Sequence, residues 1–148
     1  MAKWFSGSYR GGIEVTVDGC LVAFLINNTG HTSVKGELVH ASHTADYTAD
    51  LLTKDVPDCI GVVYASGIPA GDLMPVAIGG MPEVLLEDGT GATRGQWMRD
   101  SANVDGRAVA EDLPAPPANT NHFNEIGHCL QSVVAGTDKL CRIVMHFN

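Results

Sequence analysis

The chain has 148 residues, and its 9 basic and 17 acidic residues give a formal net charge of −8 at pH 7. This length is typical of one domain with a single core, and the acidic balance argues against a nucleic-acid partner, because Lys and Arg hold phosphate backbones. The longest unbroken apolar run, residues 20–26, is far shorter than the roughly 20 residues that span a bilayer, so no membrane helix is expected.

The first twelve residues differ in composition from the rest. They contain aromatic and basic side chains and no acidic one: Lys3, Trp4, Phe5, Tyr9 and Arg10. Residues 13–148, by contrast, carry seven basic and seventeen acidic residues. Segment 1–12 is interpreted in two ways, as a frayed terminus or extra edge strand, or as a flexible docking arm whose five named side chains bind a partner.

From Ile13 onward the pattern is that of short strands. Ile13, Val15 and Val17 alternate with polar residues, Asp18-Gly19 is a hairpin-turn dipeptide, and residues 20–26 form a buried-strand run. This predicts a β-hairpin, and turn signals recur downstream at intervals that suit further strands. Helical periodicity is limited to residues 46–52 and 122–130, and Gly127 argues against a helix in the second segment. The fold is therefore expected to be mainly β.

Two stretches of the chain echo each other. Residues 60–66 are matched 66 positions later by residues 126–132, and an Ala-Gly turn follows each stretch. The pattern suggests a pseudo-repeat of residues 36–78 and 95–147, although the turn signals of any β-protein can give short matches of this kind. Within the second of these stretches, residues 111–121 include three prolines and are expected to form an extended spacer or contact loop.

No metal centre is predicted. The four cysteines are far apart and form no C-x-x-C motif, so they are interpreted as small core residues in a reducing compartment. His40 and His43, with Asp46 and Asp50 nearby, are the most metal-like group, but their spacing matches no named site, and polar loop histidines are the preferred interpretation.

No catalytic or cofactor-binding set is predicted either. His128 and Cys129 are adjacent in an expected strand, where their side chains point to opposite faces and cannot form a dyad. The G-x-S-x-G nucleophile motif is absent, and the glycine-rich stretch 89–95 lacks the Gly-Lys-Ser/Thr ending of a phosphate loop. The acid pairs Glu87-Asp88 and Glu111-Asp112 are interpreted as solvated turns.

The order and spacing of several turn-and-strand segments resemble a known group of proteins. The segments are Gly36-Glu37-Leu38-Val39, Ile60-Gly61-Val62-Val63, residues 70–76, Glu83-Val84-Leu85-Leu86, Gly95-Gln96-Trp97-Met98 with Gly106-Arg107-Ala108, residues 126–130 and residues 143–148. From about Gly36 to Asn148 the chain is similar to the capsid decoration, or cement, proteins of tailed bacteriophages, which are commonly encoded beside the major capsid protein. These segments include no catalytic residue.

The resemblance implies a structural virion protein. Such a protein has a compact β-barrel or β-tulip-like body. Together with the residue patterns, this predicts such a body or a small sandwich of short antiparallel strands, with at most one or two short helices, preceded by an extended N-terminal arm that lies outside the resemblance. Its expected partners are the major capsid protein and further copies of itself in a homotrimer. It would be made in the cytoplasm of the bacterial host, an expectation that agrees with the lack of a secretion signal after Met1, and would lie on the outer capsid surface.

Two other classes stay open. A head-fibre, host-attachment or carbohydrate-binding module would use the same β-body with exposed aromatic residues, for which Trp97 is the candidate outside the arm. A small hydrolase would need a convergent nucleophile, base and carboxylate, and no such set can be named from the sequence.

Overall fold

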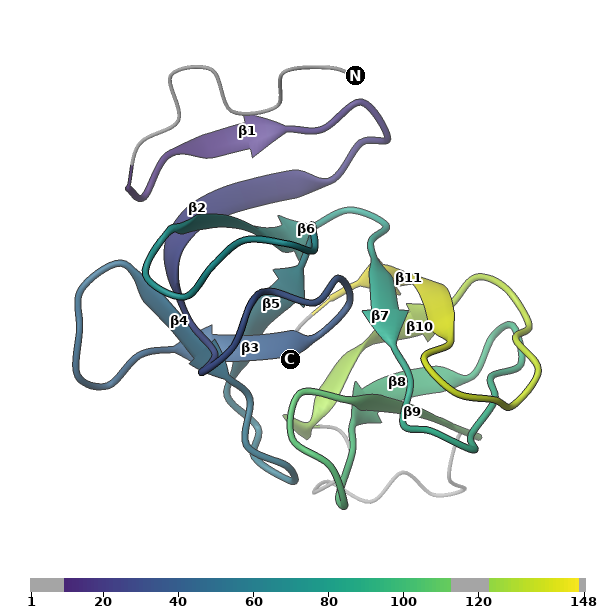
Figure 1. The fold of residues 1–148 in the computed structure, drawn as a ribbon. Coiled ribbons are helices and arrows are strands. Elements are labelled where there is room, and N and C mark those ends of the chain that lie inside the picture. The colour runs from purple at the N-terminus through teal and green to yellow at the C-terminus, as the bar shows by residue number, and fades with distance from the viewer. Residues whose placement is uncertain (1–9, 113–122, 147–148) are drawn as a thin grey trace.

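The computed structural model describes residues 10–112 and 123–146. This part of the chain consists of short strands joined by turns (Figure 1). The strands are β1 (Ile13–Val15), β2 (Leu21–Asn28), β3 (Leu38–Ala41), β4 (Thr48–Leu51), β5 (Cys59–Val63), β6 (Leu73–Gly79), β7 (Glu83–Leu85), β8 (Trp97–Asp100), β9 (Ala108–Glu111), β10 (Glu125–Cys129) and β11 (Leu140–Met145). The mainly β fold predicted from the sequence is confirmed.

Five of these strands form a closed barrel. β2 pairs with β6 antiparallel on one side and with β4 parallel on the other, and the sheet continues through β3 and β5 back to β6. β2 alternates buried and more exposed residues over most of its length, as a strand with one face in a core does. The parallel β2–β4 pair departs from the expectation of antiparallel strands alone.

β1 lies outside the barrel and pairs with β2, so that residues 13–15 face residues 21–23 across the hairpin. The hairpin predicted around Asp18-Gly19 is therefore present, and Gly19 adopts a positive φ of 85° in its turn. Two further backbone hydrogen bonds, from Gly11 N to Phe24 O and from Phe24 N to Gly12 O, extend the pairing into the last residues of the predicted arm 1–12.

The other five strands form an antiparallel sheet in the order β7-β11-β10-β8-β9. The edge strands of this sheet are β7 and β9. Leu86, which directly follows β7, and Ala108, the first residue of β9, form an isolated parallel bridge. The barrel and this sheet lie side by side (Figure 1), and one hydrophobic cluster joins them. Its largest members are Phe24, Leu38, Leu52, Leu86, Met98, Ile126 and Ile143. A second cluster, which includes Val39, Met74 and Val76, fills the barrel itself.

The two sheets share one pairing scheme. In the barrel, β3 pairs with β5 through Leu38↔Val62 and Val39↔Gly61, the register skips Ile60, and it resumes at His40↔Cys59. In the second sheet, β8 pairs with β10 through Trp97↔His128 and Met98↔Gly127, skips Ile126, and resumes at Arg99↔Glu125. A β-bulge therefore occurs at the same place in both sheets.

The rest of the scheme agrees with this correspondence. Val39↔Leu51 in β3–β4 corresponds to Met98↔Ala110 in β8–β9, and Val62↔Ala77 in β5–β6 corresponds to His128↔Val144 in β10–β11. The residues matched in the sequence echo, 60–63 and 126–129, thus occupy equivalent pairing positions. That an ancestral duplication produced them stays a hypothesis.

Both predicted helical segments are wrong where the structure describes them. Residues 48–51 form β4, and residues 125–129 form β10. Cross-strand pairing with β2 and β3 in the first case, and with β8 and β11 in the second, outweighs the weak helical period. Within residues 10–112 and 123–146, no helix is long and apolar enough to cross a bilayer. Glu111, the first residue of the predicted Pro-rich loop, still pairs in β9, and residues 113–121 of that loop lie outside the described residues.

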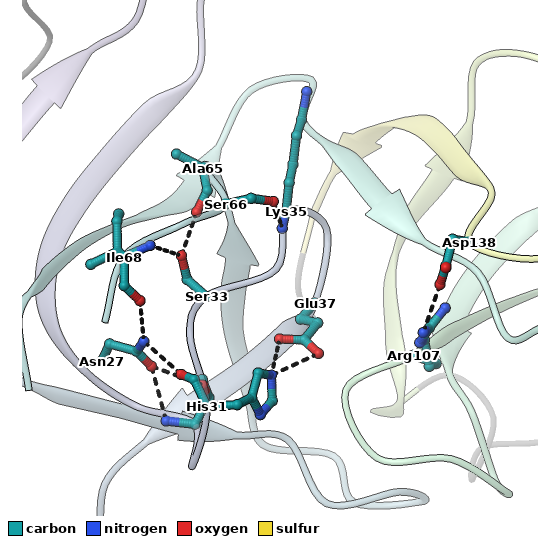
Figure 2. A network of polar contacts seen from close by, with 11 residues as sticks. Asn27, His31, Ser33, Lys35, Glu37, Ala65, Ser66, Ile68, Arg107 and Asp138 are labelled. Carbon is teal, nitrogen blue, oxygen red and sulfur yellow. Dashed lines mark hydrogen bonds and ion pairs between the residues drawn. The ribbon is translucent and has the colours of Figure 1, made fainter. Parts of the chain in front are cut away.

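A buried asparagine organises the loops at one end of the barrel (Figure 2). Asn27 is almost fully buried; its Nδ2 donates to the carbonyl oxygens of His31 (3.0 Å) and Ile68 (2.9 Å). Its Oδ1 accepts from the backbone N–H (3.0 Å) and the hydroxyl (2.8 Å) of Thr29. All four hydrogen bonds that the amide can make are formed, so this side chain fixes two loops to the end of β2.

This network predicts a large penalty for the isosteric change Asn27→Asp. The change replaces the Nδ2 donor by an oxygen facing two carbonyl oxygens, and we expect it to lower the free energy of unfolding by about 2–4 kcal/mol. Urea denaturation of the two proteins measures the difference. The matched control Asn28→Ala alters an exposed residue of the same strand and should cost less than about 0.5 kcal/mol. Equal costs for the two variants would contradict the role given to Asn27.

Candidate functional site

The β1–β2 hairpin carries an apolar strip that nothing in the described structure covers. Ile13, Val15 and Val17 are 59%, 72% and 83% exposed, and Leu21, which faces Val15 across the hairpin, is 37% exposed. We call these four residues the β1 strip. In a hairpin whose other face packs on a core, apolar side chains would face inward, so this outward orientation makes the β1 strip a candidate interaction surface.

The strand beneath the strip also has a free edge within the described residues. β1 is the terminal strand of its sheet; it pairs with β2, and no described strand pairs with its other side. An edge of this kind can accept a strand from another chain through backbone hydrogen bonds. The β1 strip would then lie against the partner's side chains.

The predicted docking residues are only partly covered by the structure. Lys3, Trp4, Phe5 and Tyr9 lie outside the described residues, so their proposed role stays a prediction. Arg10 is described and exposed, in the turn that leads into β1. The β1 strip follows directly on that arm in the sequence. The alternation of Ile13, Val15 and Val17 had indicated a strand, but not that its apolar face is the outer one.

Asp18 holds the tip of the hairpin against the body. Its Oδ1 accepts hydrogen bonds from the hydroxyl of Thr16 and from that of Tyr64 (2.8 Å), which lies just after β5. Its Oδ2 is 3.9 Å from a guanidinium nitrogen of Arg142 in β11. The hydrogen bond from Thr16, aided by that from Tyr64, lowers the pKa of Asp18 below its usual value despite partial burial. The hairpin is thus tied to both sheets.

The structure assembles two clusters of possible metal ligands. The first contains His40 and His43, as the sequence suggested, but its carboxylate is Asp58; the expected neighbours Asp46 and Asp50 do not belong to it. Asp58 Oδ2 is 3.7 Å from Nδ1 of His40 and 3.8 Å from Nε2 of His43. His43 is largely exposed, whereas His40 lies in β3 rather than in a loop, and its Nδ1 is 2.9 Å from the carbonyl oxygen of Ala41.

The second cluster was not predicted from the sequence. Oε1 of Glu125 lies 3.1 Å from Nε2 of His128 and 3.0 Å from Nε2 of His146. The glutamate side chain is buried, both histidines are partly exposed, and the ring of Trp97 stands edge-on to that of His128. Trp97, the candidate aromatic of a carbohydrate site, is therefore a half-buried residue at the start of β8 that packs beside this cluster.

The cysteines do not form a nucleophilic site. All four are free; Cys20, Cys129 and Cys141 are buried, and burial raises the pKa of Cys59 to about 12. The thiols of Cys129 and Cys141 are neighbours, and their hydrogen bond raises the pKa of Cys129 and lowers that of Cys141. Buried thiols of this kind act as small packing residues.

Two concave regions of the described residues differ in size and in the charges that line them. A cavity of about 50 Å³, lined in part by Cys59, Asp100 and Glu125, has room for water but not for an ordinary organic substrate. An open groove between the barrel and the second sheet runs between Glu37 and Arg107 (Figure 2). Its charges are already paired: Arg107 is 3.0 Å from Asp138, and Glu37 is 2.9 Å from His31.

Comparison with known proteins adds no identification: neither a family model nor a curated protein sequence matches the chain.

The anchoring of the hairpin predicts a pH-dependent effect of Asp18→Ala. Because the folded pKa lies below the unfolded value of about 3.9, the carboxylate stabilises the fold above that pH, and this contribution is lost as the pH falls through the folded pKa. For this partly exposed group we expect a cost of about 1 kcal/mol at pH 5–7 that shrinks below about pH 4.

Urea unfolding of both proteins between pH 3 and pH 7 measures this cost. The control Asp46→Ala removes an exposed carboxylate from the β3–β4 turn and should change stability by less than about 0.5 kcal/mol at every pH. A cost for Asp18→Ala that does not vary with pH would show that the carboxylate charge is irrelevant to the anchor.

Proposed function

We propose that the chain is a structural virion protein, a decoration or cement protein that binds the outer surface of a tailed-bacteriophage head. The observation that carries this proposal is the β1 strip on an edge strand, immediately after a cationic, aromatic N-terminal segment. The turn-and-strand segments between residues 36 and 148 resemble those of such proteins, and the mainly β fold is compatible with the proposed class.

The proposed partner is the major capsid protein. Strand addition at the free edge of β1 would supply main-chain hydrogen bonds, and burial of the strip would supply hydrophobic free energy. Side chains of the arm, Trp4, Phe5 and Tyr9, would fill pockets on the capsid subunit, since aromatic anchors dominate the energetics of many interfaces.

In this proposal the protein acts mechanically. Each copy bridges neighbouring capsid subunits, and a homotrimer at three-fold and quasi-three-fold positions would connect several subunits at once. Linked binding sites raise the overall avidity above that of each separate contact. Many modest interfaces would therefore resist the internal pressure of packaged DNA.

Deletion of residues 2–9 tests the arm. This variant keeps Gly11 and Gly12, which are hydrogen-bonded to Phe24, so the body should fold with an unchanged melting temperature. We expect its co-sedimentation with expanded empty heads of the encoding phage to fall at least about 10-fold, because the aromatic anchors are gone. If the deletion variant binds heads as well as the wild type does, the arm is not an anchor.

Charge placed in the β1 strip tests the hairpin independently. The double change Val15→Asp with Val17→Asp would bury two carboxylates in the proposed interface, so we expect head binding to fall by about 100-fold or more. Both positions are exposed in the free protein, and the melting temperature should stay constant.

The matched control for the strip is Val134→Asp. Val134 is 85% exposed in the loop between β10 and β11, away from the hairpin, and this variant should bind heads like the wild type. Equal binding by all three proteins would contradict docking through β1. Binding of the wild type to host cells or glycans, with none to heads, would instead favour the attachment-module alternative.

A further inference from the structure

The cluster of Glu125, His128 and His146 has a donor set that suits a transition-metal ion. We propose that these three side chains form a site for Zn²⁺ or a closely related divalent ion, with a fourth coordination position open to solvent. Two imidazole nitrogens and one carboxylate oxygen make up a familiar three-ligand zinc set. This inference does not depend on the proposed function.

The distances are those of a nearly assembled site. All three ligand atoms lie within 4.8 Å of one another, and Oε1 of Glu125 is 3.1 and 3.0 Å from the two Nε2 atoms. Zinc bonds of 2.0–2.2 Å at tetrahedral angles separate neighbouring ligand atoms by about 3.3–3.4 Å. The two separations between Glu125 and the imidazoles therefore need to lengthen by only a few tenths of an ångström to admit the ion, and the two imidazole nitrogens already lie within 4.8 Å of each other.

The β-bulge of β10 is what brings two of the ligands to one face. Glu125 and His128 are three residues apart and would point to opposite faces of a regular strand. The register skips Ile126, so Glu125 pairs with Arg99 and His128 with Trp97, two residues of β8 that share a face. Because of the bulge, the side chains of Glu125 and His128 lie next to each other on one face of the sheet although the two residues are three positions apart in the sequence.

The third ligand is placed by β11. Val144 pairs with His128, and His146, two residues further on, lies on the same face. The backbone N–H of His146 donates to the carbonyl oxygen of Ile126, at 3.1 Å, which fixes the end of β11 against the bulge. Gly127 permits this close approach, because a Cβ there would lie 2.1 Å from the carbonyl oxygen of Val144. Two ligands thus lie in β10, and the third directly follows the end of β11.

The barrel provides an internal comparison. It has the same bulge, and by the shared register its residues equivalent to Glu125, His128 and Trp97 are Cys59, Val62 and Leu38. Those residues pack in or against the core between the two sheets. The fold therefore accommodates the bulge without any ligand set. In the second sheet the same face is partly open to solvent, yet the Glu125 carboxylate is 99% buried beside two imidazoles.

A divalent cation held by Glu125 and two neutral imidazoles would interact favourably with the negative charge of this buried carboxylate. Partial exposure of His128 and His146 leaves a route for the ion and room for a water molecule as fourth ligand. The cluster of His40, His43 and Asp58 is a weaker candidate. Its separations are 3.7 and 3.8 Å, and Nδ1 of His40 already contacts a backbone carbonyl.

The test is calorimetric titration of the purified full-length chain with Zn²⁺ after treatment with EDTA and removal of the chelator. We expect one high-affinity site per chain. His128→Ala and His146→Ala should each weaken binding by about 100-fold or more, because each removes a ligand. His43→Ala, which alters the other cluster, should leave the affinity within about two-fold of the wild type.

Thermal denaturation gives a second readout that does not depend on calorimetric heats. An ion that binds only the folded chain should raise the melting temperature of the wild type by roughly 5–10 °C when present at 100 times its dissociation constant. The shift should disappear in His146→Ala, whose ligand lies at the exposed end of β11. The melting temperature of that variant without metal shows whether it still folds.

Two results would overturn the proposal. One is the absence of saturable Zn²⁺ binding to the wild type below about 1 mM. The other is binding that survives both His128→Ala and His146→Ala but is lost in His43→Ala, which would assign the ion to the other cluster.

Discussion

The hydrophobic contact between the barrel and the second sheet is the interaction on which the rest of the structure depends. Phe24, Leu38 and Val62 of the barrel belong to the same cluster as residues of the second sheet, and all three are essentially inaccessible to water. Exposure of this surface would be unfavourable for either sheet alone. The turn before β9 adds backbone hydrogen bonds across the contact, from Leu38 N to the carbonyl oxygen of Gly106 and from Gly106 N to that of Leu52.

This contact also explains why two sheets with one pairing scheme have different surfaces. In the barrel, the outer face of β3 and β5 is covered by the second sheet and carries Leu38 and Val62. In the second sheet, the equivalent face carries Trp97 and His128 and is partly exposed. The covered face of the barrel contributes to the hydrophobic core. On the partly exposed face of the second sheet, the two histidines and Glu125 are placed to bind the proposed metal ion. The β1 strip, at the far edge of the barrel sheet, is the other surface left open.

Much of the fold could be predicted because local patterns specify it. The alternation from Ile13 to Val17 and the turn at Asp18-Gly19 predict the first hairpin without reference to any other part of the chain. The parallel pair β2–β4 and the closure of the barrel could not be predicted in this way, because they depend on contacts between distant segments. Residues 46–52 were misassigned for the same reason: their weak helical period carries no information on the strands that flank β4.

The candidate metal site was missed for a specific physical reason. A period of two places Glu125 and His128 on opposite faces, and only the bulge at Ile126, which has no clear sequence signal, reverses that assignment. The sequence did not indicate that Asp58 lies near His40. Asp58 immediately precedes β5, and β5 pairs with β3, which contains His40, only in the folded sheet. The docking arm differs from these sites, because the sequence predicted it and the described structure does not include most of it. Composition singled it out, but its key side chains, Trp4, Phe5 and Tyr9, lie outside the described residues.

In the proposed function, the chain joins its β1 hairpin to the coat of a virus particle. Cryo-electron microscopy of mature heads purified from the encoding phage tests this most directly. We expect density for the two-sheet body on the outer surface, with β1 aligned beside a strand of the major capsid protein. Heads that lack the chain altogether, or that hold it through the second sheet with β1 facing solvent, would contradict it.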